Sequence, residues 1–236
     1  MVAPRCWPNT CVSATVWTWG YGSVKDCFDK WGFGCASPRP QVVQADPLKI
    51  AVVKKLRRLA RRADVELWSL DECHFQQHGS RCRMWVPPEI KDPILQHAPT
   101  RKSVACFGAV NLRTGQFVRT MCKVFNAITF RHFLAQLLPH RARRRRMIVV
   151  LDNARYHHAV LLAPFLRQHA AHLRLLFLPP YSPQLASIER VWKLTRRLAT
   201  HNRYFATLDD VLKSVNACFN RWRRPNPILY RLCCIT

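Results

Sequence analysis

The spacing of apolar residues separates predicted strands from predicted helices along this chain. Residues 65–72 (VELWSLDE), 147–153 (MIVVLDN) and 173–179 (LRLLFLP) are short, nearly continuous apolar runs, as expected for strands buried on both faces. Residues 103–125 predict two more strands, joined as an antiparallel hairpin that turns at Gly115.

Helical spacing dominates the remaining ordered stretches. The clearest case is residues 46–64, where Asp46 occupies the N-cap position, Pro47 lies in the first turn, and an apolar stripe begins at Ile50. Further helices are predicted at residues 128–140, 159–170, 188–202 and 208–222. The order is then strand, strand, strand, helix, strand, helix, strand, helix, helix. It predicts an α/β fold in which an antiparallel hairpin is extended by parallel β-α-β units and flanked by helices.

The first part of the chain has a different character. Roughly the first twenty residues show neither the apolar spacing of a helix nor that of a strand. A short helix is predicted at residues 22–33, and a proline-rich linker at residues 36–47.

The charge of the chain indicates a polyanionic partner. Thirty-eight Lys and Arg stand against 13 Asp and Glu, which gives a formal net charge of +25. Nucleic acid is the commonest partner of this kind, although a coating protein without chemistry or a merely solvated basic surface remains open. The basic residues that we expect to contact DNA phosphates are Lys54, Lys55, Arg57, Arg58, Arg61, Arg62, Arg141, Arg143, Arg144, Arg145, Arg146, Lys193, Arg196 and Arg197.

The eleven cysteines are not expected to form a secreted disulfide framework, because their number is odd and no C-x-x-C pair is present. Reduced thiols and a cytoplasmic location are expected. A zinc site from Cys73, His74, His78 and Cys82 is the weaker alternative, since its spacing fits no standard knuckle. The chain contains no apolar run long enough to span a bilayer, and no secretory h-region follows its start.

Acidic residues are scarce, and three of them occupy notable positions. Asp71 and Asp152 follow strongly apolar strands, and Glu189 begins a helix shortly after residues 173–179. Acids at the carboxyl ends of neighbouring strands converge on one edge of a sheet. Carboxylate oxygens suit Mg²⁺ or Mn²⁺, and two such ions roughly 3.5–4 Å apart would support phosphodiester chemistry. Three unrelated acids, with Glu189 paired to Lys193 one helical turn on, are the alternative.

Three segments, LDECHFQQHGSRCRMW, VVLDNARYHHA and LPPYSPQLASIERVWK, together resemble the catalytic domain of mariner-superfamily transposases, in the bacterial insertion-sequence branch of DDE endonucleases. The resemblance implies a ribonuclease-H-like fold and assigns Asp71, Asp152 and Glu189 as catalytic metal ligands. It implies that Asn153 and His157 orient Asp152 or contact phosphate, with capping and turn roles as the alternative. Glu72, beside Asp71, is a further candidate site residue, and a surface or hydrogen-bonding role is its alternative. We expect Trp85 and Trp192 to be core residues.

The implied activity is metal-dependent cleavage of a DNA strand at an element end, followed by attack of the freed 3′-hydroxyl on target DNA. Double-stranded DNA is the implied partner, and a homodimer would fit the family. Residues 1–45 are expected to be a remnant of a helix-turn-helix region and linker, and residues 46–236 the catalytic domain. A catalytically idle DNA-binding remnant and a nuclease without strand transfer are the alternatives.

One departure from the family pattern concerns the start of the Glu189 helix. The family usually has Asn-Pro before Ile-Glu, where this chain has Ala186 and Ser187. Ser187 is therefore expected to cap that helix.

Overall fold

The computed structural model describes residues 30, 49–87, 89–90, 92–97, 99–180 and 185–235. Apart from Lys30, these residues belong to one compact unit, residues 42–236. The linker at residues 36–47, the caps at Asp46 and Pro47, and the turn at residues 181–184 lie outside the described residues, as does all of the predicted helix at residues 22–33 except Lys30. The division of the chain at residue 45 stays a prediction.

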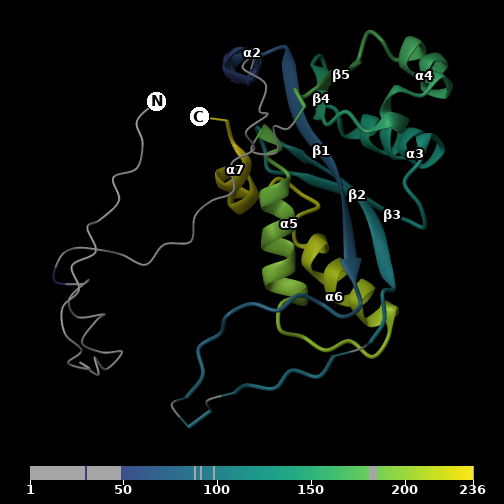
Figure 1. The fold of residues 1–236 in the computed structure, drawn as a ribbon. Helices are drawn as coiled ribbons and strands as arrows, with labels where there is room; N and C mark the ends of the chain where they lie inside the picture. Colours follow the sequence, from purple (N-terminus) through teal and green to yellow (C-terminus); the bar gives the residue numbers. More distant parts are fainter. Residues whose placement is uncertain are drawn as a thin grey trace, which may run out of the picture. The chain divides into compact units, whose positions relative to one another are not determined.

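A five-stranded sheet in the order β3-β2-β1-β4-β5 forms the centre of the molecule (Figure 1). The strands are β1 (Val65–Gln76), β2 (Ser103–Asn111), β3 (Phe117–Cys122), β4 (Arg146–Leu151) and β5 (Leu173–Phe177). β2 is antiparallel to both β1 and β3, while β1, β4 and β5 are parallel. The mixed sheet predicted from the sequence is therefore confirmed.

The first strand is longer than predicted. We expected it to end at Glu72, but β1 continues to Gln76. Beyond Glu72 the side chains alternate, with Cys73 and Phe75 buried and His74 exposed, so this stretch is a half-buried strand that pairs with β2. Asp71 consequently lies inside β1 rather than at its end. The neighbouring strand β4 ends at Leu151, so Asp71 has no β4 residue paired with it.

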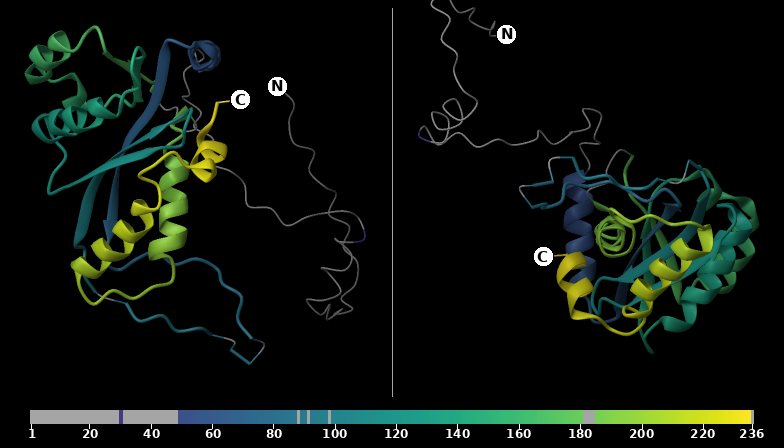
Figure 2. Two further views of the ribbon diagram at one scale, coloured as in Figure 1. Left: turned by 180° about the vertical axis from the view of Figure 1, so that it is seen from behind. Right: turned by 90° about the horizontal axis from the view of Figure 1, so that it is seen from below.

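The sheet is covered on both faces. The helices are α2 (Lys49–Arg61), α3 (Ala127–Leu137), α4 (Ala163–Gln168), α5 (Glu189–Thr195), α6 (Leu208–Asn220) and α7 (Pro227–Cys233). Figure 2 shows α3 and α4 on one face and α2, α5, α6 and α7 on the other. A π-helical turn, Arg196–Thr200, directly extends α5. α7 was not predicted from the sequence.

Each face of the sheet has its own core. On the α3 side, the ring of Phe107 in β2 stacks on Phe133 with a centroid distance of 5.5 Å. On the α5 side, Trp192 and Phe219 pack against Phe75 of β1. The apolar side chains of β1 alternate between these two cores, which explains why its sequence reads as a continuous apolar run.

The start of α5 differs from the prediction. Ser187 does not cap the helix: the N-cap position is Ile188, and it has no side-chain cap. The amide of Ile188 instead donates to the hydroxyl oxygen of Ser69 in β1 at 3.3 Å. The first turn of α5 is thus held by the sheet rather than by its own cap.

Two apolar residues proved to be surface residues. Trp85, expected in the core, is fully exposed on the long connection between β1 and β2, and Ile50 at the start of α2 is 68% exposed. No helix in the described part of the chain is both long enough and apolar enough to cross a bilayer.

Candidate metal-dependent site

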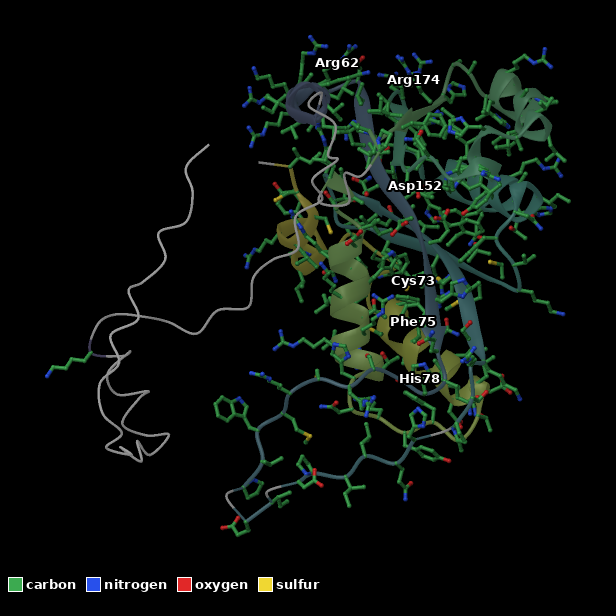
Figure 3. The ribbon with its side chains drawn as sticks, viewed as in Figure 1. Arg62, Cys73, Phe75, His78, Asp152 and Arg174 are labelled. Atoms are coloured by element: carbon green, nitrogen blue, oxygen red, sulfur yellow. The ribbon has the colours of Figure 1, made fainter. Side chains whose placement is uncertain are left out.

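The sheet register brings Asp71 and Asp152 to the same level. Ser69 of β1 pairs in parallel with Val150 of β4. Because both strands run in the same direction, the residues two positions further on, Asp71 and Asp152, lie side by side just past the last residue of β4. Asp71 is half-buried and Asp152 is exposed. In Figure 3, Asp152 lies between the Arg62 and His78 ends of β1.

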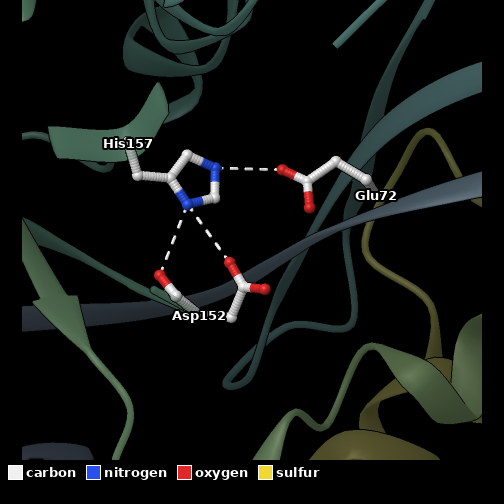
Figure 4. A group of neighbouring side chains, drawn as sticks. All are labelled: Glu72, Asp152 and His157. Carbon is white, nitrogen blue, oxygen red and sulfur yellow. Dashed lines mark hydrogen bonds and ion pairs between the residues drawn. The ribbon is translucent and has the colours of Figure 1, made fainter. Parts of the chain in front are cut away.

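A buried histidine links two of the acids. His157 lies in a short 3₁₀ turn, Arg155–His158, directly after Asp152. Its Nδ1 is 3.2 Å from Oδ1 of Asp152, and its Nε2 is 3.0 Å from Oε1 of Glu72 (Figure 4). With both ring nitrogens facing acceptors, His157 holds the two carboxylates on either side of its ring. The ring of Tyr156 packs edge-to-face against that of His157, with a centroid distance of 4.5 Å, and burial and Glu72 both raise the pKa of the Tyr156 hydroxyl.

The electrostatics of the site follow from this crowding. Burial and the neighbouring Glu72 raise the pKa of Asp71 to about 7. Hydrogen bonding to His157 lowers the pKa of Asp152. Burial works against a charge on His157, but its contacts with Asp152 and Glu72 outweigh it and raise the pKa of the imidazole to about 9. Asp152 is therefore stabilised as an anion, whereas partial burial and the charge of Glu72 both disfavour the anion of Asp71.

Asn153 makes a different contact from the one expected. Its side-chain nitrogen donates to the carbonyl oxygen of Leu178 at 2.5 Å. The amide of Leu178 in turn donates to the carbonyl oxygen of Leu151 at 2.8 Å. Asn153 thereby ties the ends of β4 and β5 together, and a contact with phosphate stays a prediction.

Glu189 lies at the start of α5, close to β1. Its neighbour Ile188 contacts Ser69, and Trp192, one turn further on, donates its indole N–H to Oδ2 of Asp71 at 3.1 Å. The Glu189 carboxylate itself pairs with Lys193 at 3.9 Å. The structure therefore places the backbone of Glu189 over the part of β1 that carries Asp71, while its side chain makes the helical pair that the alternative interpretation expected.

One group of three metal-type ligands is found in the described part of the chain. Atoms of Glu72, Asp152 and His157 lie within 4.8 Å of one another. Asp71 is not in this group, but the charges of Glu72 and Asp152 both raise its pKa, and carboxylate oxygens suit a hard divalent cation. A cation there would offset the burial and the repulsion from Glu72 that together raise the pKa of Asp71.

The predicted basic residues differ in how accessible they are. All six on or directly after α2 (Lys54, Lys55, Arg57, Arg58, Arg61 and Arg62) are exposed. In the turn before β4, Arg141 donates to the carbonyl oxygen of Arg145 at 2.7 Å. Arg146, the first residue of β4, donates to the carbonyl oxygen of Ala170 at 2.8 Å. Arg196 contacts the sulfur of Cys73 at 3.0 Å. These three arginines therefore also hold the fold together.

The described cysteines are free thiols, as expected. Cys73 is buried next to Arg196, whereas Cys82 is exposed and its backbone carbonyl oxygen accepts a hydrogen bond from the side chain of Asn202. The two ends of the alternative zinc motif thus lie in different surroundings.

Comparison with known proteins places this chain in a family. Residues 66–212 match the sequence profile described as DDE superfamily endonuclease. The chain belongs to the DDE superfamily endonucleases. An uncharacterized protein of Sinorhizobium fredii (strain NBRC 101917 / NGR234) is 29% identical over 115 residues, which cover 49% of this chain and 82% of that protein.

Solved structures show the same fold. This chain resembles the Mos1 transposase paired-end complex with the left transposon end (TM-score 0.64, 16% identity, covering 90% of this chain and 66% of that chain). It also resembles the Mos1 mariner paired-end complex with Mn (0.64, 17%, 90% and 66%) and the isolated catalytic domain of Mos1 mariner transposase (0.55, 16%, 84% and 91%). The ribonuclease-H-like fold of this DDE endonuclease domain is thereby confirmed, and the chain spans just under two thirds of the length of the paired-end complex chains.

Sequence reasoning missed two contacts at the site. Trp192 was assigned to the core alone, although its N–H bonds to Asp71, and Tyr156 was not considered. The three-residue spacing from Glu189 to Trp192, which places both on one side of a helix, was the available signal.

Proposed function

We propose that this chain is the catalytic domain of an insertion-sequence DNA transposase. It cleaves a DNA strand at an element end and joins the freed 3′-hydroxyl to target DNA. The observation that carries this proposal is the side-by-side placement of Asp71 and Asp152 past the end of β4, with α5 laid across β1 at the same level. Membership of the DDE superfamily endonucleases and the likeness to Mos1 transposase complexes support it.

In this proposal Asp71, Asp152 and Glu189 hold two Mg²⁺ or Mn²⁺ ions. Bound cations would supply an activated water or 3′-hydroxyl and stabilise the leaving oxygen of the phosphodiester. Glu189 takes part by rotating its side chain from the exposed Lys193 towards Asp71. This costs little, because a surface pair of this kind contributes at most about 1 kcal/mol.

The remaining groups of the site orient the ligands. His157 fixes the carboxylate of Asp152 with one nitrogen and is itself fixed by Glu72 with the other. A histidine held between two acids keeps both side chains in one arrangement, which is the usual role of groups that support metal ligands. The exposed cations of α2 would hold the DNA backbone through contacts that do not depend on sequence.

A plasmid-nicking assay tests this function. Supercoiled plasmid carrying candidate element ends would be incubated with the protein and Mg²⁺ or Mn²⁺, with EDTA as a control. Asp71→Asn, Asp152→Asn and Glu189→Gln should each abolish nicking while DNA binding persists, and double variants should be little worse than single ones. Glu89→Gln makes the same chemical change on the exposed β1–β2 connection and should nick normally.

The assay also separates the alternatives. Joining of a pre-cut end with a free 3′-hydroxyl to a second plasmid distinguishes a transposase from a nuclease without strand transfer. If the wild-type protein neither nicks nor joins DNA, the proposed activity is wrong and a catalytically idle remnant is favoured. If Glu189→Gln nicks as well as Glu89→Gln does, Glu189 is an ordinary surface acid.

A further inference from the structure

We propose that Trp192 is a positioning residue that orients Asp71 for metal binding, and that Gly108 keeps the space which this contact requires. The inference rests on the proposed function of Asp71 as a metal ligand. It begins from one contact: the indole N–H of Trp192 donates to Oδ2 of Asp71 at 3.1 Å. Trp192 is 2% exposed, so this bond forms away from bulk water.

The indole ring is held rigidly by its neighbours. Its edge-to-face aromatic contacts have centroid distances of 6.1 Å to Phe75, 5.7 Å to Phe117 and 6.3 Å to Phe219. A ring clamped in this way cannot turn to follow the carboxylate. The direction of the N–H therefore sets the orientation of Asp71, and the donor also favours its charged form.

Gly108 provides the room for this arrangement. It lies directly opposite Asp71 in the β1–β2 register. A Cβ atom at Gly108 would lie 2.8 Å from Cζ2 of Trp192 and closer still to Cη2. Even alanine at this position would therefore push the indole ring away from the place where it meets Asp71.

The competing interpretation is that the bond only satisfies a buried indole nitrogen. Trp68 offers a matched control for it. Trp68 is fully buried in the same strand, three residues before Asp71, but packs in the core on the opposite face. Its indole nitrogen has no hydrogen-bond partner among the described residues. Trp68→Phe therefore removes similar aromatic volume without removing a bond to Asp71.

The test compares Trp192→Phe with Trp68→Phe in the full chain. Binding of Mn²⁺ would be followed by electron paramagnetic resonance of the free ion, and plasmid nicking would be measured over a range of Mn²⁺ concentrations. Trp192→Phe should raise the half-saturating Mn²⁺ concentration roughly 10–100-fold, the usual effect of losing a group that supports a metal ligand. Nicking at saturating Mn²⁺ should largely recover. Trp68→Phe should leave the Mn²⁺ dependence unchanged.

Equal Mn²⁺ dependence in the wild type and both variants would overturn the positioning role, as would equal weakening in both variants. If the wild type itself neither binds Mn²⁺ nor nicks DNA, the proposed function fails and this inference fails with it. Should Trp192→Phe not fold, the indole N–H resonance of Trp192 can be followed by NMR in the wild type and in Asp71→Asn instead. It should shift on addition of Mg²⁺ to the wild type and in Asp71→Asn, and an unmoved resonance would overturn the inference.

Discussion

Substitution of Gly108 by alanine tests the packing around the site most sharply. The added methyl group would overlap the Trp192 ring and would lie 3.0 Å from Cε2 of Phe117. Overpacking of this kind costs about 1–3 kcal/mol in the free energy of unfolding. Alanine also lowers the conformational entropy of the unfolded chain relative to glycine, which stabilises the folded state by roughly 0.4–1 kcal/mol. The expected net loss lies between about 0 and 2.6 kcal/mol, with a midpoint near 1.3 kcal/mol, and is measured by equilibrium urea unfolding.

A double-mutant cycle makes the cause of this loss specific. Phenylalanine at position 192 lacks the ring atoms that a Cβ at Gly108 would meet. Gly108→Ala should therefore be close to neutral, or slightly stabilising, in the Trp192→Phe background. The coupling energy between the two changes should be on the order of 1–2 kcal/mol, within the range seen for residues in contact. An equal cost of Gly108→Ala in both backgrounds would show that the strain does not arise from the indole ring.

Two further outcomes are expected. His157→Gln should weaken Mn²⁺ binding about 10–100-fold and destabilise the domain, because it removes a buried group that holds Glu72 and Asp152. Mn²⁺ titration and urea unfolding curves equal to those of the wild type would contradict this role. Replacement of Lys54 and Arg58 by alanine should weaken binding to any DNA duplex. The slope of the logarithm of the binding constant against the logarithm of the salt concentration should fall by roughly one unit for each lost phosphate contact. Fluorescence anisotropy at several salt concentrations measures this slope, and an unchanged slope would exclude α2 from the DNA-binding surface.

Much of the architecture could be predicted from the sequence because buried strands have a strong signature. The runs at residues 147–153 and 173–179 are largely apolar, interrupted within the strands only by the exposed Arg174, and both correspond to parallel strands whose apolar side chains enter the two cores. The end of β1 was harder to predict, since its pattern changes from continuous to alternating after Glu72. The exposed Trp85 could not be placed, because a large apolar residue in a connection has no periodicity to indicate its surroundings.

The candidate site, too, could be predicted from the sequence only in part. Asp71 and Asp152 could be paired from the sequence because parallel strands end at the same edge of a sheet. The bond between Trp192 and Asp71 joins residues 121 positions apart, and it depends on the ring orientation that Gly108 permits. The start of α5 was also mispredicted, because the partner of Ile188 is a side chain of β1 rather than a cap next to it in the chain. Such contacts follow from packing and leave little trace in local sequence.

The most direct test of the central claim is the position of Mn²⁺ in a crystal of the protein, located by its anomalous scattering. We expect a peak between Asp71 and Asp152, about 2 Å from carboxylate oxygens of both, with the side chain of Glu189 turned from Lys193 towards the ion. A peak held by Glu72 and His157 without Asp71, or no peak at a Mn²⁺ concentration that supports nicking, would contradict it.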